Sequence, residues 1–409
     1  MTKKKLLFIA YGGSHIKLLL PVIRRLFNDE NYQILIFGLP GAIPDLKRNN
    51  LNYISYLNFV SDIPNEFFTN ETISKIVEDN HNPNLNFSKF ESLAYLVINV
   101  FNFSLEHKLT FDEASKKIKE IGRQVFYPVK FFKNIFSIIK PDAIISTISP
   151  KSERAALKAG RDSNIISISL DDLFGNHYVH DPVAEYHFVM SDYVKDMYSK
   201  KLSHQDKIFN TGNPYLEDYF NDYTKESATI FTEKIILFLY QNMYFDNKTK
   251  KIIPIPMKGC EKFVKNLSAS ANKNGYTVAI RNHPNLQMRD RIKVDSVLNF
   301  DSISLNESLA KSIYIVGFDS TVLLQSLIVG KEIVEIKFND YVSTLALTDK
   351  GLSKEISLND SPERISSVIF NSTLGKIKNK SINYFVGHIN ATKRVINQLN
   401  TIINEAHKF

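Results

Sequence analysis

The sequence of 409 residues contains a single cysteine, Cys260, so no disulfide can form within the chain. It also lacks an apolar run of transmembrane length, because the longest uncharged and mostly apolar stretch, residues 92–105, is shorter than the roughly 20 residues that a spanning helix needs. The apolar run at residues 6–10 is too short for the core of a signal peptide, so we expect no targeting segment. These features favour a soluble protein of a reducing cytoplasm.

The chain has no strong excess of either charge, with 51 Lys and Arg residues against 43 Asp and Glu residues and a net charge of +8. The basic residues form no stripe with interleaved aromatic side chains, so we expect no nucleic-acid partner. The small excess suits a phosphorylated small molecule and the anionic face of a membrane equally well. Hydrophobic residues at 44% and charged residues at 23% exclude a disordered chain, and the length predicts two domains.

Strands and helices alternate at the start of the chain. Residues 6–10 are a continuous apolar run typical of a strand buried on both faces. Residues 16–27 carry apolar side chains at helical spacing, and residues 33–37 predict the next strand. Such a series predicts a parallel sheet that is built through right-handed crossovers.

A helical insertion is predicted at about residues 61–130, where helical patterns and clustered aromatic residues replace the alternation. It either packs a core of its own or forms a surface that faces an acceptor or a membrane, and both readings stay open. The alternation returns with strands at residues 141–146 and 165–170 on either side of a helix at residues 152–160.

The chain becomes polar without clear periodicity near residues 218–232, so we place the domain boundary there. The first domain then covers residues 1–222, and the second covers residues 230–409 and ends in a closing helix. Strands of the second domain are predicted at residues 235–240, 276–280, 312–316 and 331–336. We therefore expect an α/β protein with two doubly wound domains that face each other across a cleft, where ligands bind beyond the carboxyl ends of the strands.

The segment Arg281-Asn282-His283-Pro284 directly follows a predicted strand. A residue before proline is held in an extended conformation, so His283 is fixed at the strand end, and Arg281 shares its face. A guanidinium and an imidazole placed in this way could bind a phosphate. The alternative is a loop histidine that caps a backbone carbonyl.

A second candidate anion site lies at residues 317–321, between a predicted strand and a predicted helix. Asp319 or Ser320 suits the N-cap position, and the hydroxyls of Ser320 and Thr321 would add donors to the positive helix terminus. Helix capping alone explains the same residue types. Because this segment and His283 both follow strands of the same half of the chain, we expect them to converge.

Two adjacent carboxylates, Asp171 and Asp172, follow the predicted strand at residues 165–170. Such a pair is costly to keep close unless it caps a helix, binds a metal or acts as a base, and surface solvation is the alternative. Because Asp181 is the only other carboxylate nearby, we predict no metal site.

The turn Gly12-Gly13-Ser14-His15 follows the first predicted strand. The glycines would let the backbone approach an acceptor, and His15 at the helix start could deprotonate a hydroxyl or bind an anion. An ordinary turn with Ser14 as the helix cap explains the segment equally well.

The segment Thr211-Gly212-Asn213-Pro214 closes the first predicted domain. Gly-Asn-Pro forms a rigid turn, and at a hinge Gly212 and Asn213 could line the donor site. A purely structural turn is the other reading, and it is favoured.

In combination these segments resemble the GT-B glycosyltransferases, the class with two Rossmann-like domains. Within this class the acidic pair, the His-Pro motif and the Ser-Thr motif are similar to those of bacterial sialyltransferases and polysialyltransferases. The segments that carry the resemblance are residues 12–15, residues 186–192 followed by 211–214, residues 281–284, and residues 319–321 followed by 322–331.

The resemblance implies an inverting, metal-independent sugar transfer in which Asp171 or Asp172 is the base. It also implies that His283, Ser320 and Thr321 hold the phosphate of a CMP-linked, sialic-acid-like donor. No cofactor other than this nucleotide sugar is expected.

This chain departs from the sialyltransferase pattern, because Leu173-Phe174 separates the acidic pair from Gly175. The implied acceptor is a saccharide or a glycolipid of bacterial surface polysaccharide, with peripheral contact to the inner membrane. Non-hydrolysing UDP-N-acetylglucosamine 2-epimerases and CDP-glycerol transferases share the C-terminal arrangement, so both remain alternatives. A non-catalytic nucleotide-binding protein is a third reading.

Overall fold

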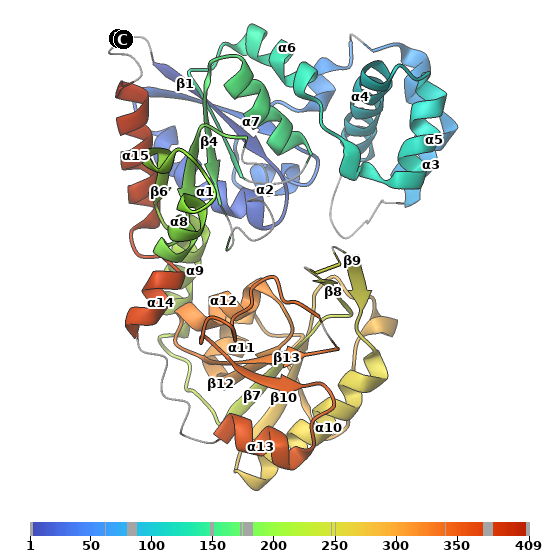
Figure 1. The fold of residues 1–409 in the computed structure, drawn as a ribbon. Helices are drawn as coiled ribbons and strands as arrows, with labels where there is room; N and C mark the ends of the chain where they lie inside the picture. The colour runs from blue at the N-terminus through green and yellow to red at the C-terminus, as the bar shows by residue number, and fades with distance from the viewer. Residues whose placement is uncertain are drawn as a thin grey trace. The chain divides into compact units, whose positions relative to one another are not determined.

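The computed structural model describes residues 3–61, 63–79, 88–147, 151–171, 174, 183–246, 248–249, 251–339, 341–370 and 379–405. The chain divides into two compact units (Figure 1). The first unit consists of Met1–Tyr215 together with Gly387–Phe409, and the second unit is the intervening stretch Leu216–Val386.

The first unit is built on a six-stranded parallel sheet with the strand order β2-β1-β3-β4-β5-β6. The strands predicted at residues 6–10, 33–37, 141–146 and 165–170 are confirmed as β1 to β4, each within two residues of the predicted ends. The six strands are β1 (Lys4–Ala10), β2 (Tyr32–Gly38), β3 (Ala143–Thr147), β4 (Ile166–Leu170), β5 (Tyr186–Val189) and β6 (Ile208–Asn210).

Strand β1 lies between β2 and β3 and is buried on both faces, as its apolar run predicts. Its alternate side chains enter two different cores. Leu6 and Phe8 pack with helix α1 (Ser14–Phe27), and Leu7 and Ile9 pack with the helical insertion. The sheet is therefore covered by helices on both faces, the arrangement that all-parallel sheets require. The unit also contains α2 (Ile43–Arg48), α7 (Ser152–Asp162) and α8 (Asp192–Ser199).

The predicted insertion is helical in the structure, and its aromatic residues build the core on one face of the sheet. Phe67 stacks on Phe111 with ring centroids 4.0 Å apart, and Phe131 stacks on Tyr56 at 4.9 Å. The insertion contains the 3₁₀ turns Tyr56–Phe59, Asn65–Thr69 and Arg123–Val125 and the helices α3 (Glu71–Asp79), α4 (Lys89–His107), α5 (Phe111–Ile121) and α6 (Val129–Ile139). Among the described helices, none combines the length and the apolarity that crossing a bilayer requires.

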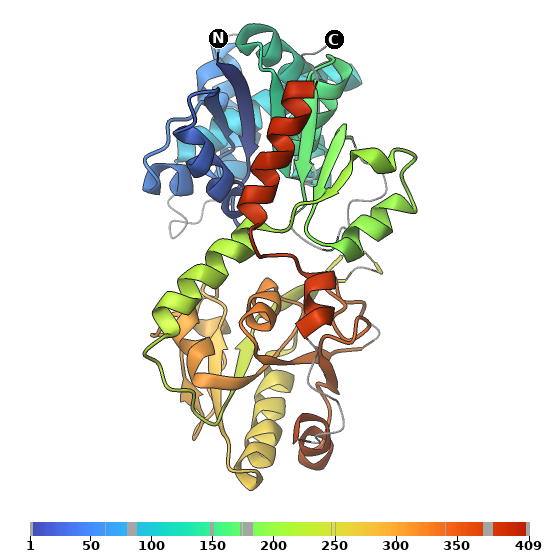
Figure 2. The ribbon, with the colours of Figure 1, turned by 90° about the vertical axis from the view of Figure 1, so that its left-hand side faces the viewer.

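The C-terminal helix α15 (Ala391–Glu405) packs against the first unit, as Figures 1 and 2 show. Val395, Leu399 and Ile402 are spaced as one face of a helix, and they join the core that contains α1 and β1. The predicted second domain, residues 230–409, differs from the structure at this end. The physical reason is that the apolar stripe of α15 is buried on the first sheet.

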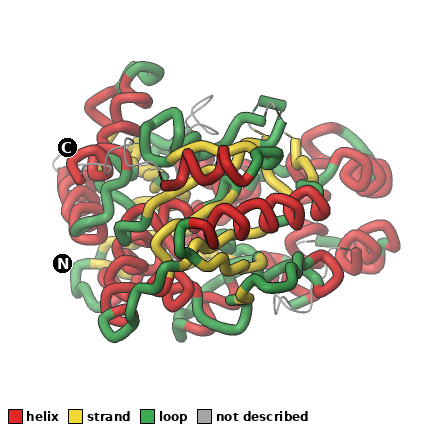
Figure 3. The backbone as a smooth tube through the Cα atoms, turned by 90° about the horizontal axis from the view of Figure 1, so that it is seen from below, coloured by secondary structure: helices red, strands yellow, loops and turns green. Residues whose placement is uncertain are grey.

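The second unit is also built on a six-stranded parallel sheet, with the strand order β11-β10-β7-β12-β13-β14. All four strands predicted for this half are confirmed, and helices pack along the sheet (Figure 3). The strands are β7 (Ile235–Tyr240), β10 (Thr277–Asn282), β11 (Leu298–Asn299), β12 (Ser312–Gly317), β13 (Glu332–Lys337) and β14 (Lys354–Ser357). The helices are α9 (Pro214–Ser227), which begins at the unit boundary, α10 (Met257–Lys273), α11 (Leu305–Lys311), α12 (Thr321–Ile328), α13 (Pro362–Phe370) and α14 (Asn379–Phe385).

Two elements at the start of the second unit differ from the sequence-based expectation. The polar stretch at the predicted boundary is largely helix α9 rather than an irregular linker. A two-stranded antiparallel hairpin, β8 (Met243–Asp246) and β9 (Lys251–Pro254), stands between β7 and α10. Its inner face is anchored by Tyr244, whose ring centroid lies 3.8 Å from that of Tyr341.

Candidate functional site

Three neighbouring strands of the second unit, β10, β7 and β12, bring polar residues to the same edge of the sheet. The backbone N–H of His283, after β10, donates to the carbonyl of Tyr240 at 2.8 Å. The side chain of Gln241, after β7, donates to the carbonyl of Asp319 at 3.2 Å. Because β10 and β12 flank β7, the loops that follow them are about 10 Å apart, which is two strand spacings. His283 and Ser320 therefore lie at one edge, within reach of a single ligand.

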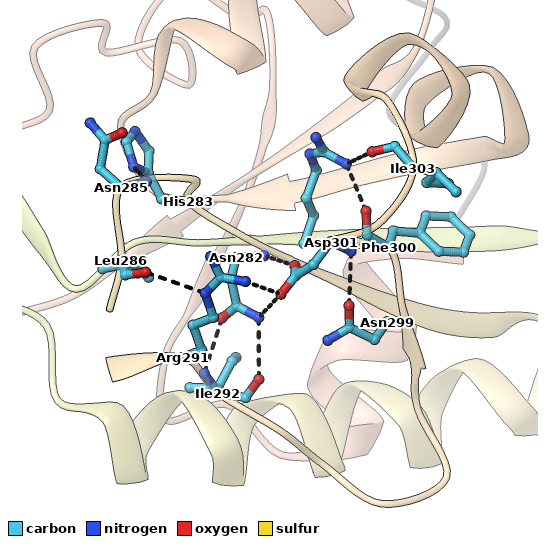
Figure 4. A network of polar contacts seen from close by, with 11 residues as sticks. Asn282, His283, Asn285, Leu286, Arg291, Ile292, Asn299, Phe300, Asp301 and Ile303 are labelled. Carbon is cyan, nitrogen blue, oxygen red and sulfur yellow. Dashed lines mark hydrogen bonds and ion pairs between the residues drawn. The ribbon is translucent and has the colours of Figure 1, made fainter. Parts of the chain in front are cut away.

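The imidazole of His283 is exposed, and its Nδ1 accepts a hydrogen bond from the backbone N–H of Asn285 at 3.2 Å (Figure 4). A neutral ring that accepts at Nδ1 carries its proton on Nε2. Partial desolvation lowers the pKa of His283 and so favours this neutral form. The side chain thus offers an Nε2–H donor, whereas the alternative of a ring that caps a backbone carbonyl is not what the structure shows.

The loop that carries His283 is held by a buried network around Asn282 (Figure 4). The side-chain amide of Asn282 donates to Asp301 at 3.0 Å, and its carbonyl accepts the N–H of Ile292 at 3.0 Å. Arg291 completes the network with an ion pair to Asp301 at 3.3 Å. Sequence reasoning missed this network, although a polar residue at the end of an apolar strand was a signal that could have pointed to it.

Arg281, predicted as a phosphate ligand beside His283, binds a loop of the second unit through its guanidinium. Its Nη1 donates to the carbonyls of Phe300 and Ile303, both at 2.7 Å, and to the hydroxyl of Ser308 at 2.9 Å. These carbonyls belong to the irregular loop after β11 and need donors, which the guanidinium supplies. Arg281 therefore fixes a loop, while Pro284 is exposed and follows His283 in a turn.

Ser320 is the N-cap of α12, because its hydroxyl oxygen accepts the N–H of Val322 at 3.3 Å. Its own O–H proton stays available for a ligand, and the exposed Thr321 is the first residue of the helix. The carboxylate of Asp319 accepts the backbone N–H groups of Thr344, at 2.6 Å, and Leu345, at 2.9 Å. Its charge is therefore engaged by the loop after β13, which lessens the repulsion that an anion at the helix terminus would meet.

In the first unit, His15 follows β1 and contacts the end of the neighbouring strand β3. Its Nδ1 lies 2.6 Å from the hydroxyl oxygen of Thr147, and that hydroxyl lies 2.7 Å from a carboxylate oxygen of Glu153. Thr147 and Glu153 are fully buried. Sequence reasoning proposed His15 but missed both partners, because the contact joins residues that are far apart in the chain.

Charged groups surround this chain of hydrogen bonds. Lys151 is the N-cap of α7 with a φ of 75°, and its pKa is lowered, mainly by burial and secondly by Arg123. Burial also raises the pKa of Tyr11, whose ring meets that of His15 edge-on at 5.6 Å. Glu153 raises the pKa of both residues, so it opposes the shift of Lys151 and adds to that of Tyr11. Its carboxylate therefore lies near two cations, Lys151 and Arg123, and near the phenol of Tyr11.

The glycines of the first turn serve packing in the structure. A Cβ on Gly12 would lie 2.5 Å from the carbonyl oxygen of Gly41, so the absence of a side chain lets Gly12 pack against a neighbouring loop. The sequence-based prediction was that this glycine lets the backbone approach an acceptor. Gly13 has a φ of 72° and is the N-cap of α1, whereas Ser14 is the first helical residue. The predicted cap at Ser14 is therefore one residue out of place.

Asp171 comes directly after β4 and is 4% exposed, which excludes the alternative of a solvated surface residue. Its backbone N–H donates to the carbonyl of Phe188 at 2.9 Å and so continues the pairing with β5. The predicted base Asp172, and Gly175 of the acidic motif, lie outside the described residues. Among the described residues, no group of three or more His, Cys, Asp or Glu side chains could hold a metal ion.

The turn at Gly212 and Asn213 contacts the returning C-terminal segment. Gly212 has a φ of 81°, and a Cβ there would lie 2.7 Å from the carbonyl oxygen of Gly387. The N–H of Asn213 donates to the same carbonyl at 2.7 Å, and Arg394 donates to the carbonyl of Thr211 at 3.1 Å. These contacts agree with a structural turn, and the donor-binding role of Gly212 and Asn213 stays a prediction.

No model of a known protein family matches the chain, and no curated protein matches it in sequence. Solved structures do match over nearly the whole length. A UDP complex of MnaA from S. aureus is 12% identical with a TM-score of 0.57, and the match covers 98% of this chain and 97% of that chain. The UDP-GlcNAc 2-epimerase from Methanocaldococcus jannaschii is 12% identical with a TM-score of 0.56, covering 97% and 99%.

A third similar structure is the glycotransferase of kitacinnamycin, 10% identical with a TM-score of 0.54 over 97% of this chain and 100% of that chain. At these identities the likeness concerns the fold. The predicted fold class is confirmed: the chain has the two-unit α/β fold of GT-B-like epimerases and glycosyltransferases.

Proposed function

We propose that the chain is a nucleotide-sugar enzyme whose second unit binds the nucleotide phosphates. The observation that carries this proposal is the arrangement of donors at one sheet edge: the Nε2–H of His283 after β10, and the hydroxyls of Ser320 and Thr321 at the N-terminus of α12. Such donors oppose the negative charge that grows on a departing nucleotide. No step requires a metal ion in this proposal, because the protein donors supply the stabilisation.

A uridine diphosphate is the best-supported nucleotide. The similar S. aureus structure is a complex with UDP, and a similar structure of the M. jannaschii epimerase contains UDP-GlcNAc and UDP. Two phosphates also suit donors that lie two strand spacings apart. The CMP-linked, sialic-acid-like donor stays a prediction from motif resemblance alone.

For the reaction we favour epimerisation of a UDP-linked amino sugar, since several of the similar structures are UDP-GlcNAc 2-epimerases. Transfer of the sugar to a saccharide or glycolipid acceptor of surface polysaccharide is the second candidate. It is supported by the likeness to a glycotransferase and by the presence of a histidine that can accept a hydroxyl proton.

The test is to incubate the protein with UDP-GlcNAc in the absence of an acceptor and to follow the sugar by NMR. Epimerisation produces the C2 epimer with no acceptor present. Transfer instead releases UDP only after a saccharide is added. Binding of UDP without turnover in either assay would identify a non-catalytic nucleotide-binding protein and would overturn both candidates.

Nucleotide binding is tested separately by thermal unfolding with UDP, CMP, CDP and GDP. A ligand that binds only the folded protein raises its Tm. We expect UDP to give the largest rise and His283→Ala to reduce it. His204→Ala is the matched control, because His204 is an exposed loop histidine of the first unit. An equal UDP shift in both variants would remove His283 from the site.

The outer face of the β8–β9 hairpin supports a peripheral membrane contact of this enzyme. Antiparallel sheets usually present polar side chains to water, but Met243 is 49% exposed and Ile252 is 68% exposed on this face. Lys248, between the two strands, and Lys251, in β9, are exposed on the same hairpin. Aliphatic side chains flanked by lysines suit an anionic lipid surface, where lysines bind the headgroups and apolar groups enter the acyl boundary.

Sedimentation with vesicles tests this contact. We expect binding to vesicles that contain phosphatidylglycerol, and we expect Ile252→Ser to weaken it more than tenfold. The matched control is Ile138→Ser, because Ile138 is 71% exposed on α6 of the first unit. Equal binding of both variants would place the contact elsewhere, and equal binding to neutral vesicles would exclude the role of the lysines.

A further inference from the structure

A continuous chain of hydrogen bonds links a buried carboxylate of the first unit to a histidine at the end of β1. The hydroxyl of Thr147 donates to Glu153 at 2.7 Å, and the same oxygen lies 2.6 Å from Nδ1 of His15. The N···O distance is short for its type, and the O···O distance is the usual one. The three residues come from three elements: the start of α1, the end of β3 and the first turn of α7.

The number of protons in this chain determines the protonation of the histidine. An ionised carboxylate can only accept, so the single proton of the Thr147 hydroxyl is directed to Glu153. The oxygen of Thr147 can then only accept from His15, which places a proton on Nδ1 and leaves the lone pair on Nε2. Glu153 lies in the first turn of α7, where the positive end of the helix faces its carboxylate.

The two histidines of the proposed enzyme therefore have opposite tautomers. His283 in the second unit accepts at Nδ1 and presents an N–H at Nε2, which suits a phosphate oxygen. His15 in the first unit donates at Nδ1 and presents a lone pair at Nε2, which suits a substrate proton. Each tautomer is fixed by the protein before a substrate binds.

We propose that Thr147 and Glu153 are positioning residues that hold His15 as the proton acceptor of the first unit. In this step the bond between the substrate atom and its proton breaks, the electron pair stays on the substrate atom, and the proton forms a bond to Nε2. The positive charge that appears on the ring is stabilised through Thr147 by Glu153. This inference rests on the proposed function for its substrate, and it selects His15 over Asp171 as the base.

The tautomer is tested directly by NMR of the full chain labelled with ¹⁵N-histidine, with His15→Gln used to assign the signal. We expect His15 to carry its proton on Nδ1 in the neutral form. Thr147→Val removes the acceptor for that proton but keeps the shape of the side chain, so the Nδ1–H signature is lost. A ring of His15 protonated at Nε2 in the unaltered protein would overturn the inference, whether or not the protein is active.

The kinetic test uses the same variant and a conservative partner. With the nucleotide-sugar substrate we expect Thr147→Val to lower kcat by about 10²-fold at an unchanged KM, the usual contribution of a positioned base. Thr147→Ser restores the hydroxyl and most of the activity. If both variants were equally impaired, Thr147 would have only a packing role.

Two further variants complete the test. Glu153→Gln keeps the side-chain shape but removes the carboxylate, and we expect kcat to fall about tenfold at an unchanged Tm, less than the loss of a general base itself because Glu153 acts only through Thr147. An unchanged kcat would remove Glu153 from the relay. Asp171→Asn should retain more activity than Thr147→Val, and the reverse order would assign the base to Asp171. The UDP-induced rise in Tm should be the same in all these variants, so loss of nucleotide binding is distinguished from loss of the relay.

Discussion

A third histidine, His187 in β5, has a pKa that is shifted by burial in the core and not by a place in a functional site. It is 4% exposed, and its Nδ1 lies 2.9 Å from the hydroxyl of Ser169. Burial lowers the pKa of His187 to about 4, because the charged ring would lose its hydration. The neutral ring is therefore part of the folded structure.

This shift predicts a loss of stability in acid. The pKa of a histidine in the unfolded chain is about 6.5, above the folded value, so the unfolded state takes up the proton first. The contribution of His187 is complete above pH 6.5 and is lost as the pH falls toward 4, by about 3 kcal/mol at pH 4. Urea unfolding of His187→Gln at several pH values should show a weaker dependence in this window. His204→Gln, an exposed control, should keep the full dependence.

Gly212 predicts a second effect of a single side chain. Gly212→Ala adds a Cβ at a positive φ and within 2.7 Å of a backbone carbonyl, so we expect a loss of at least about 2 kcal/mol. Gly275→Ala is the matched control, since Gly275 has a φ of 73° but nothing within 4 Å of the added atom. It should cost about 1 kcal/mol. If chemical unfolding showed equal losses of stability in the two variants, the contact between Gly212 and Gly387 would have room for the added Cβ.

The sequence predicted the position of some site residues but not their contacts. His283 and Ser320 follow strands directly, and their place depends only on where a local apolar run ends. Thr147 and Glu153 could not be found in this way, since the bond to His15 exists only when β3 lies beside β1. Arg281 was assigned to a phosphate because its loop carbonyl partners are about twenty residues further along the chain.

At the scale of elements, long apolar runs identified the central strands, whereas short or polar elements were missed. The hairpin strands β8 and β9 have four residues each, too few for a clear alternation. Helix α9 carries a largely polar surface, and it was taken for an irregular boundary. Within the predicted helical insertion, α5 ends at Ile121, because Gly122 adopts a φ of 82° and terminates the helix.

The N-terminus of α12 allows capping to be separated from ligand binding. Ser320→Ala removes the cap of α12 and should lower the free energy of unfolding by about 1 kcal/mol. It should also reduce the rise in Tm with UDP. Ser304→Ala removes the equivalent cap of α11, where the hydroxyl accepts the N–H of Glu307 at 3.0 Å. The two variants should lose similar stability, and only Ser320→Ala should lose UDP binding. If the UDP-induced rise in Tm were unchanged in both variants, Ser320 would serve only as the helix cap.

At the scale of the whole molecule, the two units have separate cores, and their unfolding can be followed separately. Leu399 of α15 and Leu267 of α10 are both fully buried, in the first and second units respectively. Replacement of either by alanine should cost about 2–5 kcal/mol. In calorimetry, Leu399→Ala should lower a transition that UDP leaves unchanged. Leu267→Ala should lower the transition that UDP raises. Lowering of one common transition by both variants would mean that the units unfold together.

The division of the chain was harder to predict than either sheet. The apolar stripe of α15 shows that the helix is buried on one side, but nothing in that stripe specifies which of two similar sheets it covers. The last helix was therefore assigned to the domain next to it in sequence. Only the packing of Leu399 and its neighbours on α1 and β1 resolves the question.

In the sequence, the second unit is one uninterrupted stretch inserted between the two segments of the first unit. The chain leaves and re-enters the first unit at adjacent points, where the N–H of Asn213 donates to the carbonyl of Gly387. On the ribosome, residues 391–405 emerge only after the whole inserted stretch has been made. Until then the first unit lacks its last helix and the core side chains of α1 that pack with it stay uncovered, while the described strands of the second unit have all been synthesised. A released chain truncated after residue 386 should therefore contain a folded second unit and an incompletely folded first unit.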